Sequence, residues 1–251
     1  MSTQSTLLFD SGYLFFYRFH ATMKYLKFRN PDEDPDPDIL KNCFLDHLEK
    51  QIIKTKKKFK ATSIIFCLDV SLKNIWRYEL FNEYKGTREH DISILPDVRK
   101  EIRVLMNKYG KCFTHPKLEA DDIAYLCVKH LRQSKNEADI NIITNDNDFL
   151  QMLKYKNVKI YNGGLKQIVG SGDPRQDLWI KILTGDKSDN IPSICGKKMA
   201  LKLMNDPDEL EKYLMKKQLK ERFELNKRLI DMDNIPLKYE NDFVKSYLEI
   251  L

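Results

Sequence analysis

The chain has 251 residues, of which 42% are hydrophobic and 32% are charged, with a formal net charge of +6 and a pI of about 8.8. This length and apolar content can supply one large domain with a sizeable core. The basic excess is compatible with a polyanionic partner without establishing one. Because the N-terminal segment lacks a signal-peptide pattern and no apolar run approaches the roughly 20 residues of a membrane span, we expect a soluble, intracellular protein with no membrane partner.

The five cysteines are far apart in the chain and form no C-x-x-C pair: Cys43, Cys67, Cys112, Cys127 and Cys195. An odd number of widely spaced cysteines argues against a disulfide framework and against a zinc knuckle. The pattern favours a reducing compartment.

Three continuous apolar runs end in acidic residues. They are Thr6–Phe9 before Asp10, Ser63–Leu68 before Asp69, and Ile140–Thr144 before Asp146. Continuous hydrophobicity is typical of strands that are covered on both faces, as in parallel sheets. Two further strands around a turn are predicted at residues 158–161 and 167–169.

Helical patterns lie between these runs. Aromatic residues from Tyr13 to His20 recur at helical spacing, and Ile39–Ile53 has the periodicity of an amphipathic helix. The proline-rich and acidic segment Arg29–Asp38 between them predicts a loop. Further helices are expected after Pro96, at 119–131, 179–183, 196–204 and 207–231, and after Pro236.

The segment Glu119-Ala120-Asp121-Asp122 places three carboxylates in four positions. Acids at a helix start can simply complement the macrodipole. However, parallel strands separated by helices bring Asp10, Asp69 and Asp146 to one sheet edge, where ligands of open α/β sheets bind. Short loops can bring three more acids to the same region: Asp148, Asp186 and Asp189.

Nine carboxylates in one region require cations, and hard divalent ions such as Mg²⁺ or Mn²⁺ prefer oxygen ligands. No His/Cys set favours zinc. A carboxylate-only site favours phosphodiester hydrolysis by two metals roughly 3.5–4 Å apart. The chain has neither a G-x-S-x-G elbow nor a P-loop. An aspartyl phosphatase would place a second Asp at position 12, which is Gly12.

A substrate phosphate also needs cations that flank the acids. Arg77, Lys85 and Arg88 follow the second strand, and Arg18 and His20 lie on the first helix. Each residue alone could be an ordinary solvated side chain. As a set, they could clamp the scissile phosphate electrostatically.

Four segments together resemble the PIN-like 5′ nuclease (flap endonuclease) family, and the small phage enzymes of that family most of all. Gly185–Pro192 followed by Gly196–Ala200 resembles the family's helix–hairpin–helix DNA-binding module. Leu118–Asp122 and Thr144–Asp148 resemble its two acidic signatures, and Glu83–Arg88 resembles the segment before its helical arch. The resemblance runs from about residue 7 to residue 236, with the motifs in the family's order.

The resemblance implies two metal sites. The first-site ligands would be Asp10, Asp69, Glu119 and Asp121, and the second-site ligands would be Asp146, Asp148, Asp186 and Asp189. Asp122 would border both sites. Lys85 would contact the reacting phosphate, and Arg18 would match the first-helix arginine. The turn at Gly196, Lys197 and Lys198 would present backbone N–H groups to duplex phosphates. From their position beside the acids, we also expect Arg77 and Arg88 to bind DNA.

The implied fold is a mainly parallel sheet flanked by helices, in a single domain over residues 1–251. Residues 1–184 would form the α/β catalytic core, with an arch near 76–96, and residues 185–251 the helical DNA-binding and C-terminal part. The family hairpin usually carries G-x-G before its lysine, whereas this chain has only Gly196. The departure leaves a K⁺ ion at the hairpin in doubt.

The implied activity is 5′-3′ exonuclease and flap endonuclease cleavage with two Mg²⁺ ions, for which Mn²⁺ could substitute. The substrate would be DNA with a 5′ end or flap, or RNA primers paired to DNA, in replication or repair, and the enzyme would act as a monomer. Two alternatives stay open. A PIN-type ribonuclease would usually lack the Gly185–Ala200 segment, and a catalytically silent DNA-binding homologue would be expected to have lost several acids.

Overall fold

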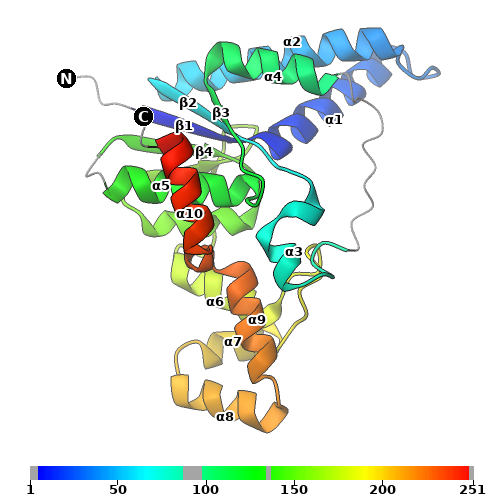
Figure 1. The fold of residues 1–251 in the computed structure, drawn as a ribbon. Helices are drawn as coiled ribbons and strands as arrows, with labels where there is room; N and C mark the ends of the chain where they lie inside the picture. Colours follow the sequence, from blue (N-terminus) through cyan, green and yellow to red (C-terminus); the bar gives the residue numbers. More distant parts are fainter. Residues whose placement is uncertain (1–4, 87–97, 134–136, 249–251) are drawn as a thin grey trace.

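The computed structural model describes residues 5–86, 98–133 and 137–248. A six-stranded sheet forms its centre, with strand order β3-β2-β1-β4-β5-β6 (Figure 1). The strands are β1 (Ser5–Asp10), β2 (Ser63–Cys67), β3 (Lys111–Phe113), β4 (Asp139–Ile143), β5 (Val158–Tyr161) and β6 (Gln167–Ile168). The expected arch near 76–96 therefore lies only partly within the described residues, and Arg88 lies outside them.

The first five strands in this order run parallel, and only β6 is antiparallel to its neighbour β5. The predicted mainly parallel sheet is thereby confirmed. In the centre, β1 pairs with both β2 and β4, with Phe9 opposite Phe66 on one side and Ile143 on the other. The carboxyl ends of these three strands consequently meet at one edge of the sheet, as the sequence predicts.

Helices cover both faces of the sheet, which explains the continuous apolar runs. Leu7 and Phe9 of β1 pack with α1 (Ser11–Arg29), α2 (Pro37–Phe59) and α4 (Val98–Tyr109). Leu8, between them, packs on the opposite face. The alternation follows from the two-residue period of a strand, so every residue of the run is buried.

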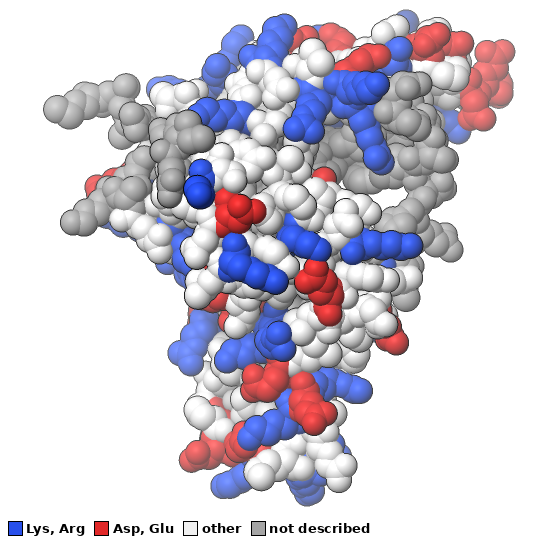
Figure 2. Space-filling view, viewed as in Figure 1, with Lys and Arg blue, Asp and Glu red and all other residues white. Residues whose placement is uncertain are grey.

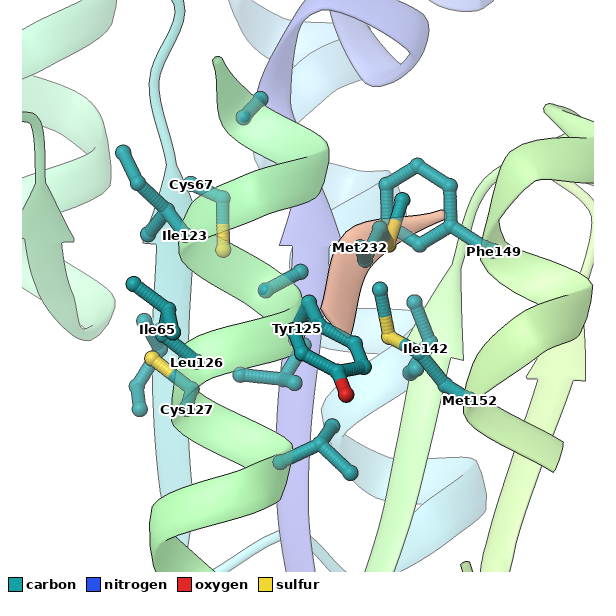
Figure 3. Packing of buried hydrophobic residues seen from close by; sticks show 14 of the residues in the cluster. Ile65, Cys67, Ile123, Tyr125, Leu126, Cys127, Ile142, Phe149, Met152 and Met232 are labelled. Carbon is teal, nitrogen blue, oxygen red and sulfur yellow. The ribbon is translucent and has the colours of Figure 1, made fainter. Parts of the chain in front are cut away.

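The opposite face carries α5 (Ala120–Gln133) and α10 (Leu237–Phe243). Figure 3 shows Tyr125 of α5 beside the sheet residue Ile142 and the side chains of Met152 and Met232. Fully burying one such large apolar side chain contributes about 1.5–3 kcal/mol. Several of them therefore anchor α5 firmly enough to hold the acidic residues at its start.

A third hydrophobic core lies in the helical part below the sheet in Figure 1. It joins α6 (Pro174–Thr184), α7 (Lys197–Leu203), α8 (Pro207–Lys217) and α9 (Lys220–Ile230). Ile75 and Tyr84 reach into it from beside α3 (Trp76–Leu80). The same small core therefore contacts the chain on both sides of α3.

Element boundaries differ from the expectations where caps decide them. The helix expected at 179–183 begins at Pro174. The Asp173 side chain caps it by accepting hydrogen bonds from the backbone N–H groups of Arg175 and Gln176, and proline suits the first helical position. The helical stretch expected at 207–231 divides into two helices, since Gln218 adopts a left-handed conformation with φ 56°. Strand β3 was not predicted. Within the described ranges, no helix has both the length and the apolarity to cross a bilayer.

Candidate metal centre

Asp10 ends β1 and caps α1. Its Oδ1 accepts a hydrogen bond from the Tyr13 backbone N–H at 3.1 Å, and its Oδ2 accepts one from the Thr144 hydroxyl at 2.8 Å. Thr144 follows the neighbouring strand β4. Asp10 is thus held by groups from α1 and β4 together, and its carboxylate is buried at the sheet edge.

Asp69 lies next to Asp10, just after β2. Its Oδ1 accepts a hydrogen bond from the Ala120 N–H at 2.9 Å, which ties the first turn of α5 to the end of β2. A Cβ atom at Gly12 would lie 3.0 Å from Asp69 Oδ2 and 3.6 Å from Asp10 Oδ1. Glycine at this position therefore allows α1 to start close against both carboxylates.

Glu119, Asp121 and Asp122 form the first acidic group. One carboxylate oxygen of each lies within 4.8 Å of the others. Asp122 is fully buried and accepts hydrogen bonds from the Trp76 indole at 3.0 Å and from Arg77 Nη1 and Nη2 at 2.8 and 2.7 Å. Asp122 is therefore bound by protein cations and dipoles, whereas Asp121 is not held by Arg77 in this way.

Arg77 lies inside the protein instead of on the expected DNA-facing surface. Its guanidinium donates to Asp122, to Glu119 at 2.9 Å and to the Leu229 carbonyl at 2.8 Å. The residue is 2% exposed. Because its donors are directed at buried acceptors, we do not retain Arg77 as a DNA contact. In this fold it fixes the first acidic group against α9.

Asp148, Asp186 and Asp189 form the second acidic group, again with oxygens within 4.8 Å of one another. Lys181 of α6 donates to Asp148 and, at 2.7 Å, forms an ion pair with Asp186. Asp146 caps the 3-10 helix η2 (Asn147–Lys154) and accepts from the Asp148 N–H at 2.9 Å.

Tyr84 and Lys85 bridge the two acidic groups. The Tyr84 hydroxyl contacts Glu119 at 3.2 Å and Asp189 at 3.0 Å. Lys85 Nζ donates to Glu119 and lies 3.9 Å from Asp189 Oδ2. Sequence reasoning selected Lys85 but missed Tyr84, Trp76 and Lys181. Of these three, only Tyr84 carried a signal, because it belongs to the Glu83–Arg88 segment.

Without added cations, burial and neighbouring acids disfavour the ionised forms of several of these carboxylates. Burial, followed by the charge of Asp69, raises the pKa of Asp10 to about 7. Burial also raises the pKa of Asp121 well above its usual range and that of Asp148 to about 6, although Lys181 opposes the latter shift. In Asp186, burial is the largest single cause and raises the pKa, but the hydrogen bond and charge of Lys181 and the hydrogen bonds from Ser188 together outweigh it and lower the pKa to about 2.

These residues fit divalent cations. Both groups consist of carboxylates only, and hard ions prefer several oxygen ligands. A bound divalent ion would stabilise the ionised forms that burial and mutual repulsion disfavour. Burial is the largest cause of the raised pKa values of Asp10 and Asp121, so a bound ion would favour the ionised forms of both carboxylates.

The other candidate cations within the described residues are Arg18, Lys197 and Lys198. Arg18 faces α2, where its Nη1 donates to Gln51 at 3.4 Å. Within the part of the chain that the structure describes, no hydrogen bond or ion pair joins Arg18 to an acid of the site. Lys197 and Lys198 are exposed on the first turn of α7, and Gly196 before them has open space around its Cα.

The helical part does not present a continuous basic stripe on the face seen in Figure 2. There, Lys and Arg side chains alternate with Asp and Glu over the lower helices. A DNA contact on the face seen in Figure 2 would therefore depend on local basic groups.

Comparison with known proteins places this site in a family. Residues 5–177 match the family model of the 5′-3′ exonuclease N-terminal resolvase-like domain. The chain therefore belongs to the 5′-3′ exonuclease family, whose members are phosphodiester-cleaving enzymes. A 5′-3′ exonuclease of Bacillus subtilis is 30% identical over 231 residues, which cover 85% of this chain and 74% of that protein.

Two phage proteins are also similar. The Ribonuclease H of Enterobacteria phage T4 is 26% identical over 251 residues, covering 85% of this chain and 80% of the relative. The bacteriophage T5 D15 protein, crystallised with metal ions, superposes with a TM-score of 0.75 at 20% identity, over 98% of this chain and 99% of that one. In a complex with DNA and metal ions, the same phage protein superposes with a TM-score of 0.71 at 19% identity, with the same coverage.

Proposed function

We propose that this protein is a Mg²⁺-dependent, structure-specific 5′ nuclease that cleaves DNA at a 5′ end or 5′ flap. The observation that carries the proposal is the pair of carboxylate groups at one sheet edge, bridged by Tyr84 and Lys85. The DNA and metal ions named for the T5 protein support DNA as the substrate class and metal ions as cofactors.

Two ions would be held by residues that the sheet edge and α5 gather from distant parts of the chain. The first would be bound by Asp10, Asp69, Glu119 and Asp121, and the second by Asp146, Asp148, Asp186 and Asp189. Bound there, two divalent ions would activate water and stabilise the leaving oxygen in an in-line displacement. Mn²⁺ could replace Mg²⁺, since both prefer oxygen ligands.

Lys85 is the cation best placed to meet the reacting phosphate. Its ammonium contacts Glu119 and lies near Asp189, and its side chain is 14% exposed. It could exchange the Glu119 contact for a phosphate oxygen once ions neutralise the acids. Tyr84 would fix the positions of the Glu119 and Asp189 carboxylates relative to each other. Arg77 would fix the orientation of the neighbouring Asp122.

Duplex binding would use the turn at Gly196, Lys197 and Lys198. A glycine with open space and two exposed lysines at a helix start can approach a phosphate backbone closely. Such contacts position DNA without reading its sequence, so the enzyme would recognise structure. We further propose that residues 1–251 act as one nuclease domain, as a monomer, in primer removal or repair. RNA paired to DNA would be a second substrate, as the name of the T4 relative suggests.

The test is incubation with a 5′-labelled flap duplex, with and without Mg²⁺, against the same duplex labelled at the 3′ end. We expect Mg²⁺-dependent release of short 5′-labelled products, while the 3′ label stays on long fragments. Release of 3′-terminal nucleotides, or cleavage that persists in chelator, would overturn the proposal. A matched flap of RNA on DNA measures the second substrate class in the same assay.

A further inference from the structure

The turn that carries Lys85 is clamped to the loop between α6 and α7. The Lys85 N–H donates to the Asp189 carbonyl at 2.9 Å. In the opposite direction, the Asn190 side-chain amide donates to the Glu83 carbonyl at 2.9 Å. These reciprocal hydrogen bonds join residues that lie more than 100 positions apart in the chain.

Both partners of the clamp adopt a left-handed backbone. The φ angles are 55° at Lys85 and 58° at Asn190. Asparagine tolerates this conformation better than most residues, because its short polar side chain can form local hydrogen bonds. The lysine side chain offers no comparable local hydrogen bond. A residue in such a conformation persists when its surroundings over-determine it. The clamp is the part of the surroundings that acts directly on the Lys85 backbone.

The backbone conformation of Lys85 determines where its ammonium points. With the turn as it stands, Nζ reaches Glu119 of the first acidic group and approaches Asp189 of the second. The preceding Tyr84 is 2% exposed and contacts the same two carboxylates. If the turn relaxed to an ordinary conformation, the Cα–Cβ bond of Lys85 would leave it in another direction.

We propose that Asn190 is a positioning residue for Lys85. Its left-handed backbone presents the Asp189 carbonyl to the Lys85 N–H, and its side-chain amide holds the Glu83 carbonyl on the other side of the turn. Asn190 supplies no ligand oxygen in this arrangement, unlike Asp186 and Asp189 in the same loop. The inference rests on the proposed role of Lys85 as the cation that meets the reacting phosphate.

Asn157 provides a matched control. It also has a positive φ, 58°, and its side-chain amide also donates to a backbone carbonyl, that of Glu137, at 3.0 Å. It directly precedes β5, at the amino-terminal edge of the parallel strands and therefore opposite the acidic groups. Asn157→Gly removes the same kind of interaction at a position remote from Lys85.

The first test is a double-mutant cycle on the single-turnover cleavage rate with Mg²⁺. Asn190→Gly keeps a backbone that accepts positive φ and removes only the amide, so we expect a slowing of about tenfold or more in the wild-type background. In the Lys85→Ala background the same substitution should slow cleavage less than about twofold. Asn157→Gly should leave the cleavage rate unchanged in both the wild-type and the Lys85→Ala background. Equal slowing by Asn190→Gly in both backgrounds would overturn the proposal.

The second test is amide hydrogen exchange of the metal-free protein, which needs no activity. Asn190→Gly should accelerate exchange at the Lys85 amide, whereas exchange of the α5 core amides should stay as in the wild type. An unchanged exchange rate at the Lys85 amide would overturn the proposal that Asn190 positions Lys85. If Lys85→Ala cleaved at the wild-type rate, the proposed role of Lys85 would fail instead, and the exchange result would still report on Asn190.

Discussion

Arg77 and Asp122 form a two-point ion pair inside the protein, with Nη1 to Oδ2 at 2.8 Å and Nη2 to Oδ1 at 2.7 Å. The side chains are 3% and 0% exposed. The pair connects the short helix α3 to the first turn of α5, where the acids of the first group lie. A charge that sequence reasoning assigned to the DNA surface thus supports the first acidic group.

Arg77→Ala should destabilise the protein strongly. Removing one partner of a buried ion pair leaves the other charge without compensation, which costs about 3–5 kcal/mol. Urea unfolding of the metal-free protein measures the loss. The control is Lys117→Ala, because the side chains of the Lys117–Glu79 pair are 35% and 48% exposed and the pair should contribute only about 0–1 kcal/mol. If Arg77→Ala kept the wild-type stability but bound the flap more weakly, Arg77 would be a DNA contact and not a structural ion pair.

The metal-free protein should lose stability as the pH rises. Asp10 has a pKa of about 7 in the folded protein, against 3.8 as its ordinary value. The folded state therefore holds this proton more tightly than the unfolded state, so the stabilisation is fully present below about pH 3.8 and is lost as the pH rises through 7. The raised pKa values of Asp121 and Asp148 act in the same direction.

Thermal unfolding in chelator between about pH 5 and pH 8 measures this dependence. Asp10→Asn cannot ionise, so its melting temperature should fall less steeply with pH than that of the wild type. Saturating Mg²⁺ should also flatten the wild-type curve, because bound ions favour the ionised carboxylates. Parallel curves for wild type and Asp10→Asn would show that Asp10 keeps an ordinary pKa.

Lys85→Ala should slow single-turnover cleavage of a 5′ flap by about 10²–10³-fold, the usual cost of removing one group that stabilises developing charge. The fold should survive, because Glu119 keeps hydrogen bonds from Arg77 and Tyr84. Lys154→Ala is the comparison, because Lys154 pairs with Asp233 on a different part of the protein. A rate equal to that of the wild type would make Lys85 an ordinary surface cation.

Much of the fold could be predicted because the local pattern and the final environment agree. The apolar runs within β1 and β2 are covered on both faces, and Asp10 and Asp69 lie where these parallel strands end. The sequence does not predict β3, because β3 is a three-residue edge strand that begins with the exposed Lys111. Its pairing with β2 depends on the rest of the sheet.

The supporting cations could not be predicted for a related reason. Arg77 lies in a mixed, charged stretch, and its burial depends on acids 42 and 45 positions further along the chain. Lys181 likewise meets Asp148 only once α6 packs against η2. No periodicity marks such pairs. Asp10, Asp69, Asp146 and the Glu119–Asp122 acids were recognisable because they follow a strand or begin a helix. Asp186 and Asp189 were recognisable from the Gly185–Pro192 segment.

Asp146→Asn should abolish cleavage and leave flap binding largely intact. The side chain is exposed at the end of β4 and makes only a local capping contact, so its substitution should not disturb the core. Because the amide cannot supply a charged ligand oxygen, the second ion should bind more weakly. Flap binding in Ca²⁺ and cleavage in Mg²⁺ would be measured on the same substrate. Wild-type cleavage would remove Asp146 from the ligand set.

The most direct measurement is anomalous diffraction from crystals soaked in Mn²⁺. We expect two peaks at the carboxyl edge of the sheet, one among Asp10, Asp69, Glu119 and Asp121, and the other among Asp146, Asp148, Asp186 and Asp189. Peaks found only elsewhere, or an edge without peaks at saturating Mn²⁺, would contradict the assignment of these carboxylates as a two-ion centre.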